Sequence, residues 1–199
     1  MDFAAFVQYV DAVTRARLAS GEEEIRSVQE KGLARRAQFL TMGQDFDQEC
    51  AREGARMLVT GLACAQFLGI NLPGLLRFSF SCMWGGLKDP EDVSALDLTP
   101  SGDFLELQTE LGEYVESLHS AGEAGKALLR TEFASCADPD VETTVSNICT
   151  LLISPFLQAV LLGAPVPEEL FRNARELARS KVAAAQTMVM GLSAGPEDL

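Results

Sequence analysis

Apolar residues recur at intervals of three or four along almost the whole chain, and this period constrains the fold more than any other feature. Near the start Phe3, Phe6, Val10 and Val13 repeat in this way and would form one stripe on a helix. No segment shows the alternation of apolar and polar residues, with a period of two, that a half-buried strand needs. The sequence therefore predicts an all-α fold, a helical bundle of about eight helices.

Residues that favour helix ends divide this pattern into eight segments. Asp and Asn favour the start of a helix, Pro its first turn, and Gly the position just after its end. Such residues delimit predicted helices over about 2–18, 22–43, 45–68, 71–84, 104–118, 122–134, 138–162 and 165–189. We expect Asp138 and Pro139 to start the seventh helix, which Pro155 should bend, and Pro165 and Pro167 to start the eighth.

A stretch rich in Gly, Pro, Asp and Ser separates two halves of similar order. In each half a long apolar helix ends in Leu-Gly and a helix opened by Pro follows. The sequence predicts tandem four-helix units packed as a pseudo-dimer, with a single packed domain as the alternative. The predicted boundaries are a first unit over 1–86, a linker over 87–102, a second unit over 103–191 and a disordered tail over 192–199.

Two predicted helices are apolar around nearly their whole circumference, in the segments Met57–Ala65 and Ile148–Ala164. Such a helix is covered by neighbours on several sides, so we expect Leu62 and Leu151 to be fully buried. The second segment is only just long enough to span a membrane and contains Pro155. We interpret it as the core helix of a soluble protein.

Charge and cysteine usage exclude several classes of function. The 199 residues include 16 Lys and Arg against 29 Asp and Glu, a formal net charge of −13. This charge disfavours nucleic acid and anionic membranes, which both require basic residues to neutralise phosphate. The cysteines form no C-x-x-C pair, so a zinc ribbon or an iron–sulfur site is not expected, and free thiols favour a cytoplasmic location. They are Cys50, Cys64, Cys82, Cys136 and Cys149.

No set of catalytic residues is evident. His119 is the single histidine, and there is no G-x-S-x-G turn that would present a nucleophilic serine. The chain also lacks the glycine-rich phosphate loops of nucleotide-binding proteins. The sequence therefore predicts no catalytic residue, and it identifies no cofactor-binding residue.

Acidic residues near the starts of the second and third predicted helices form the one candidate metal site. Carboxylates from two facing helices could hold Mg²⁺, which prefers oxygen ligands. The alternative is that these acids are solvated and stabilised by the positive ends of the helix dipoles. The candidate ligands are Glu22, Glu23, Glu49 and Glu53.

The segment Glu53–Leu72 resembles the third helix of the MazG-type all-α nucleoside triphosphate pyrophosphohydrolases, in which a Glu-x-x-Asp pair precedes an apolar helix ending in a Leu-Gly-Ile-Asp-like turn. The resemblance implies Mg²⁺ chemistry on the acids named above. Arg56 stands where the family has its metal-binding Asp, and Asn147 and Thr150 occupy the corresponding places in the second half. The metal-binding motif is therefore degenerate, and Glu53 is expected to pair with Arg56 on one helix face.

These observations favour a non-catalytic helical protein that acts by protein–protein contact, with self-association into a homo-oligomer as the expected form. The first alternative is a Mg²⁺-dependent nucleoside triphosphate pyrophosphohydrolase of the MazG type. The second alternative is a binder of an apolar small ligand in a pocket lined by Phe78, Phe80 and Trp84.

Overall fold

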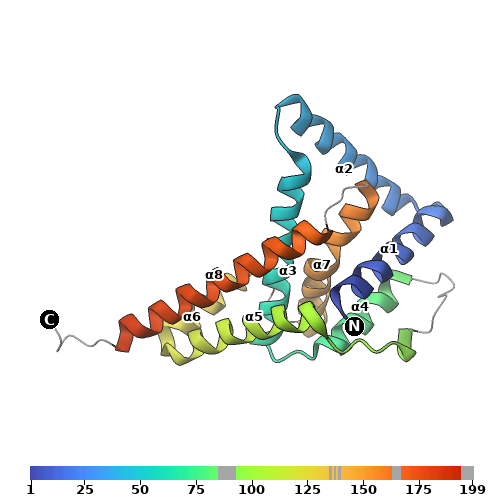
Figure 1. Ribbon diagram of the computed structural model, residues 1–199. Coiled ribbons are helices and arrows are strands. Elements are labelled where there is room, and N and C mark those ends of the chain that lie inside the picture. The colour runs from blue at the N-terminus through green and yellow to red at the C-terminus, as the bar shows by residue number, and fades with distance from the viewer. Residues whose placement is uncertain (85–92, 135, 137, 139, 163–166, 194–199) are drawn as a thin grey trace.

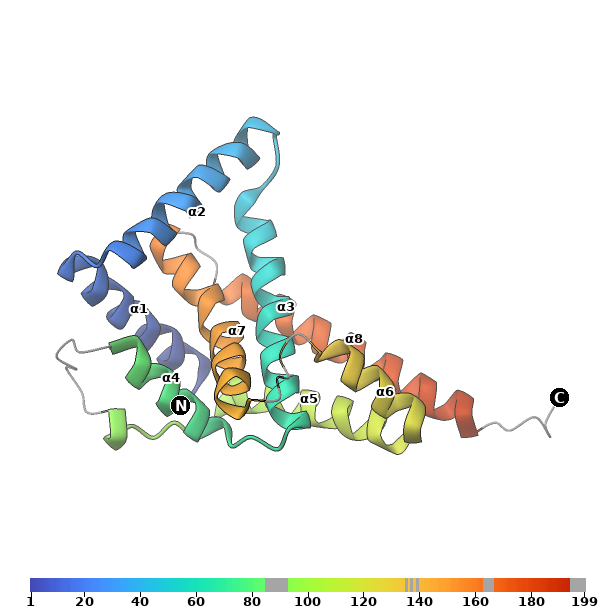
Figure 2. The same ribbon diagram turned by 180° about the vertical axis from the view of Figure 1, so that it is seen from behind.

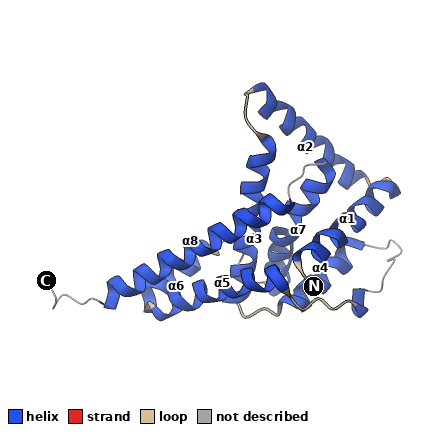
Figure 3. Ribbon diagram, in the orientation of Figure 1, coloured by secondary structure: helices blue, strands red, loops and turns tan. Residues whose placement is uncertain are grey.

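The computed structural model describes residues 1–84, 93–134, 136, 138, 140–162 and 167–193. Within these residues the chain forms eight α-helices and one short 3₁₀ helix, and no strand is present in them (Figure 3). The predicted all-α fold of about eight helices is confirmed. The elements are α1 (Phe3–Ser20), α2 (Glu23–Thr41), α3 (Phe46–Phe67), α4 (Leu72–Trp84), η1 (Val93–Ala95), α5 (Gly102–Ser120), α6 (Gly122–Glu132), α7 (Val141–Leu162) and α8 (Pro167–Ser193).

Aspartate side chains cap the starts of α1 and α3. Asp2 accepts a hydrogen bond from the backbone N–H of Ala5 at 2.8 Å, and Asp45 accepts one from the N–H of Gln48 at 3.1 Å. Each such cap satisfies an N–H group that has no partner inside the helix and stabilises it by about 1 kcal/mol. Both caps lie where the sequence predicts these helices to start, at residues 2 and 45.

The start of α7 differs from the prediction. Its cap is Asp140, which accepts a hydrogen bond from the N–H of Thr143 at 2.8 Å. Asp138, the predicted cap, accepts instead from the N–H of Asp140 at 2.9 Å and so shapes the turn before the helix. Pro139 lies outside the described residues. Two aspartates this close in sequence have equal intrinsic preference for the cap, so local pattern alone could not separate them.

Helix α3 is the central helix, and its most extensive contacts are with α7 and α8. Two glycines allow this close approach. A Cβ atom on Gly54 would lie 2.5 Å from Cδ1 of Leu170, and one on Gly61 would lie 3.1 Å from Cβ of Leu151. Since real Cβ atoms do not come as near as 2.5 Å to another heavy atom, any other residue at position 54 would require Leu170 to shift.

One aromatic cluster joins helices from both halves of the chain. The ring of Phe6 on α1 lies 5.7 Å from Phe80 on α4, 5.6 Å from Phe104 on α5 and 5.0 Å from Phe156 on α7, measured between centroids. All four side chains are fully buried. The two halves therefore share a single core, and their descent from a tandem repeat stays a prediction.

The predicted linker and tail contribute more structure than their composition suggests. Within 87–102, the described part packs Val93 and Leu98 into the core, so this end of the segment is not a free connector. Helix α8 continues to Ser193 and thus extends into the predicted tail, whose last part, 194–199, lies outside the described residues, as does Pro165.

The two apolar helices are buried to different degrees. Leu62 on α3 is 1% exposed, which confirms the prediction for this residue. The prediction for Leu151 is wrong, because this side chain is only partly buried and lies at the edge of the face that Ile148 and Leu152 turn to the core.

By length and composition α7 is also the one described helix that could cross a membrane, with 50% of its most apolar window buried inside the protein. Figure 2 shows that α7, which contains Pro155, changes direction along its length.

The outer parts of the molecule are two projections (Figure 1). Helix α2 and the start of α3 leave the core on one side, and α5, α6 and α8 extend on the other. Buried apolar side chains pack α5 along α8 in the second projection, among them Leu107, Leu111, Ala174 and Ala178. Ion pairs flank this contact: Arg175 contacts Glu106 at 2.5 Å, and Arg179 contacts Glu110 at 3.0 Å.

Candidate functional site

Helix α2 is long but poorly covered. Of its 19 residues, Ile25 is the one described side chain that is buried. Both views show this helix spanning the gap between the end of α1 and the raised start of α3 (Figures 1 and 2). A helix with so little core contact needs other interactions to hold it in place, and these define the site.

The side chains of α2 complete the C-terminal end of α7. Nε2 of Gln29 donates to the carbonyl oxygen of Leu161 at 2.9 Å, and Nη1 of Arg36 donates to that of Leu162 at 3.0 Å. The last four carbonyl groups of a helix have no partner within it, so donors from elsewhere stabilise its end. Gly32 lies between these two donors, where a Cβ would come 2.7 Å from Cδ2 of Leu162.

A second set of contacts fixes the far end of α2 to the start of α3. Nη2 of Arg36 donates to Oδ2 of Asp47 at 3.1 Å, and the guanidinium lies 6.0 Å from the ring centroid of Phe46. The rings of Phe39 and Phe46 meet edge to face at 5.5 Å. The other carboxylate oxygen of Asp47, Oδ1, is buried without a hydrogen-bond partner.

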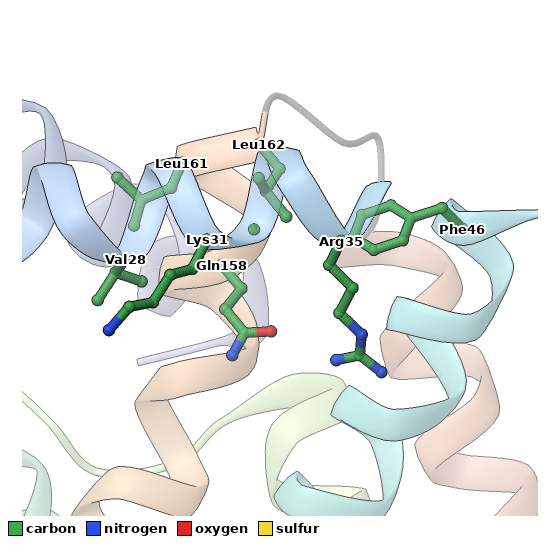
Figure 4. A pocket seen from close by; sticks show the side chains of 8 residues that line it. Val28, Lys31, Arg35, Phe46, Gln158, Leu161 and Leu162 are labelled. Atoms are coloured by element: carbon green, nitrogen blue, oxygen red, sulfur yellow. The ribbon is translucent and has the colours of Figure 1, made fainter. Parts of the chain in front are cut away.

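A pocket of about 270 Å³ lies beneath α2 (Figure 4). Its walls are mainly apolar and come from α2, from the first residue of α3 and from the last turns of α7. Three polar side chains enter it, and Figure 4 shows the amide of Gln158 between Lys31 and Arg35. The lining residues are Val28, Lys31, Gly32, Arg35, Phe46, Gln158, Leu161 and Leu162.

A second pocket, of about 210 Å³, shares Arg35, Gln158 and Leu162 with the first and continues toward α3. Nη2 of Arg35 lies 2.9 Å and 3.0 Å from the two carboxylate oxygens of Glu53, which also lines this second pocket. The hydrogen bonds that Arg35 donates to Glu53 raise the pKa of Arg35. The Arg35–Glu53 ion pair therefore stands between the two pockets.

The outer face of α2, away from these pockets, carries exposed apolar side chains. Leu33 and Leu40 are 48% and 68% exposed, and they lie two helical turns apart on one face with Ala37 between them. Met42, just past the end of the helix, is 61% exposed. Exposed apolar side chains gathered on one helix face make this face a candidate interaction surface.

The acids proposed as Mg²⁺ ligands at the start of α2 are not near those of α3. Glu22 accepts a hydrogen bond from Nε of Arg17 at 2.6 Å at the turn between α1 and α2, and Glu23 is exposed beside it. Glu53 lies opposite Arg35, which is about 20 Å further along α2 at 1.5 Å per residue.

The acids on α3 are engaged with arginines. Glu49 lies 3.7 Å from Arg52 on the same helix, and Glu53 pairs with Arg35 of α2 rather than with Arg56, which is exposed. The expected pair on one helix face is therefore replaced by one between helices. In the part of the chain that the structure describes, no group of three or more His, Cys, Asp or Glu side chains is placed to hold a metal ion.

The aromatic residues predicted to line an apolar pocket are separated by the fold. Phe80 and Trp84 are buried in the core, where Nε1 of Trp84 donates to the hydroxyl of Tyr9 at 2.8 Å. Phe78 is 44% exposed and lines a separate shallow pocket between α4 and α7. His119 is exposed near the end of α5, with its ring 5.8 Å from that of Phe67.

No family model, curated protein or solved structure matches this chain. The resemblance to the MazG-type hydrolases stays a prediction.

Proposed function

We propose that this chain is a non-catalytic, cytoplasmic helical protein that acts by protein–protein contact, and that its partner is a second copy bound at the outer face of α2. The observation that carries the proposal is the exposure of Leu33 and Leu40 on a helix that has almost no buried side chain. The free thiols of all five cysteines support a reducing compartment.

The apolar character of the outer face favours a second copy. In a two-fold dimer the same surface of both chains meets itself, and an apolar helix face is complementary to its own copy. Two α2 helices packed about such an axis would cover Leu33 and Leu40 of both chains. The basic residues Lys31, Arg35 and Arg36 take no part, because they face the pockets, α3 and the end of α7.

The test is the oligomeric state of variants with a charged outer face. Light scattering after gel filtration, at protein concentrations up to about 100 μM, should give a dimer for the wild type and a monomer for Leu33→Glu/Leu40→Glu. Leu128→Glu is the matched control, since Leu128 on α6 is 46% exposed and lies far from α2 in sequence. A monomeric wild type, or a double variant that still dimerises while remaining helical, contradicts the proposal.

The Mg²⁺-dependent hydrolase is tested separately. The pairing of Glu53 with Arg35 supports the non-catalytic proposal, because a carboxylate held by an arginine is a poorer ligand for a metal ion. We expect no pyrophosphate release from nucleoside triphosphates with Mg²⁺, and no rise in thermal stability on adding them. Hydrolysis that Glu53→Gln abolishes would favour the enzyme instead.

A further inference from the structure

The inner face of α2, opposite the proposed dimer contact, lines a pocket with apolar walls and polar side chains. The pocket beneath it has apolar walls from Val28, Leu161 and Leu162, together with the ring of Phe46. Pockets for drug-sized ligands span about 300–1,000 Å³, so one of about 270 Å³ suits a smaller molecule with an apolar body.

The two positively charged side chains at this pocket, Arg35 and Lys31, differ in how far their charge is compensated by a neighbouring acid. Arg35 is held by Glu53, so its charge is largely compensated. Lys31 forms no ion pair or hydrogen bond with any residue that the structure describes, and it lies one turn before Arg35 on the same face of α2. The pocket thus offers one uncompensated positive charge at its edge.

The amide of Gln158 adds a neutral donor and acceptor. It comes from α7 and enters between the two basic side chains (Figure 4). A carboxylate placed beside Lys31 could also accept a hydrogen bond from this amide, and hydrogen bonds to a charged group are the stronger kind. A nucleoside triphosphate fits poorly, because Glu53 lies just beyond Arg35 and the chain carries a net charge of −13.

We propose that this pocket binds a small amphipathic carboxylate, with the apolar body between α2 and α7 and the carboxylate at Lys31 and Gln158. The ligand is a free small molecule of the medium-chain fatty acid type. Because α2 forms one wall and α7 the other, bound ligand would also hold α2 against the core.

Isothermal titration calorimetry with decanoate tests the site. We expect saturable binding of one decanoate per protein chain. Decyltrimethylammonium, which has the same alkyl chain and the opposite charge, should bind at least about tenfold more weakly. Lys31→Glu should weaken decanoate binding at least about tenfold. Val28→Trp, which fills the pocket, should abolish it.

Two controls separate this site from other effects. Arg56→Glu makes the same charge change as Lys31→Glu at an exposed position on α3 that lines neither pocket, and it should leave the affinity unchanged. Leu33→Glu/Leu40→Glu should bind decanoate like the wild type, so failure of self-association leaves this test intact. The proposal is overturned by equal losses in Lys31→Glu and Arg56→Glu, by equal binding of the cationic analogue, or by absence of binding at millimolar decanoate.

Discussion

The guanidinium of Arg36 lies 3.0 Å from the carbonyl oxygen of Leu162, a residue 126 positions further along the chain. This hydrogen bond attaches a poorly covered helix to the end of a buried one. It also places the pocket, because Leu162 is part of its wall. The position of α2 therefore depends on polar contacts with α7 as well as on apolar packing.

Replacing Arg36 should loosen α2. Arg36→Leu leaves the Leu162 carbonyl and the Asp47 carboxylate without this donor, which should lower the free energy of unfolding by about 1–3 kcal/mol. Urea denaturation measures the change, and hydrogen exchange should show faster exchange of the α2 amides. Arg56→Leu, at an exposed arginine of α3, should stay within about 0.5 kcal/mol of the wild type. Equal effects of both substitutions would show that Arg36 does not anchor α2.

Two glycines should respond to alanine in opposite directions. At Gly54 a Cβ would lie 2.5 Å from Cδ1 of Leu170 and 3.0 Å from Cβ of Pro155, so Gly54→Ala forces buried neighbours to shift and should destabilise the protein by about 1–3 kcal/mol. At Gly112, inside α5, a Cβ meets nothing within 4 Å, and Gly112→Ala should stabilise by about 0.5–1 kcal/mol. Thermal unfolding of the two variants tests the pair, and a stabilised Gly54→Ala would contradict the packing of α3 on α8.

Acidification should remove the stabilisation that Glu22 provides. Its hydrogen bonds from Arg17 hold the pKa of this carboxyl below its ordinary value. The unfolded chain therefore binds the proton first as the pH falls, so the contribution is present above about pH 5 and is lost progressively as the pH falls below the ordinary pKa of a glutamate. Denaturant unfolding should give a stability difference between wild type and Glu22→Gln that shrinks over this range.

The Arg17→Met background provides the control for that experiment. Without the guanidinium, Glu22→Gln should have almost no effect at any of these pH values, because the cause of the lowered pKa is gone. A pH-dependent effect of Glu22→Gln that persists in this background would assign the stabilisation to another group.

The cysteines should react with a thiol reagent at very different rates. Cys82 is exposed on α4 and should react first with Ellman's reagent in the native protein. The thiol of Cys64 is fully buried, and its hydrogen bond with Cys136 together with burial raises its pKa, so both its access and its thiolate fraction are low. Burial also raises the pKa of Cys50 and Cys149, which should react slowly. Mass spectrometry of a short exposure identifies the labelled positions; early labelling of Cys64 would contradict its burial.

Local pattern predicts the helices well because caps and apolar periods act over a few residues. The burial of Leu62 follows from its helix alone, whereas the partial exposure of Leu151 depends on how α3 and α7 cross, and Gly61 sets that crossing. Whether a residue at the edge of a helix face is buried depends on the neighbouring helices, and the placement of those helices depends on the packing of the whole core.

The site was less accessible to sequence reasoning for the same reason. The acids Glu22 and Glu53 are visible in the sequence, but each pairs with an arginine of the preceding helix, Arg17 of α1 and Arg35 of α2, and the spacing along the chain does not indicate these partners. The spacing of Lys31 and Arg35 places both on one face of a helix, which is a readable signal. Nothing local indicates that Gln158, from a distant helix, faces them across a pocket.

The dependence of α3 on α7 and α8 has a consequence for synthesis of the chain. Helix α3 ends at Phe67, and α7 begins only at Val141. At about 5–20 residues per second, the ribosome needs several seconds to cover this interval. During that time the part of α3 that α7 and α8 cover in the folded protein lacks these partners, so the nascent first half exposes apolar surface until the second half emerges.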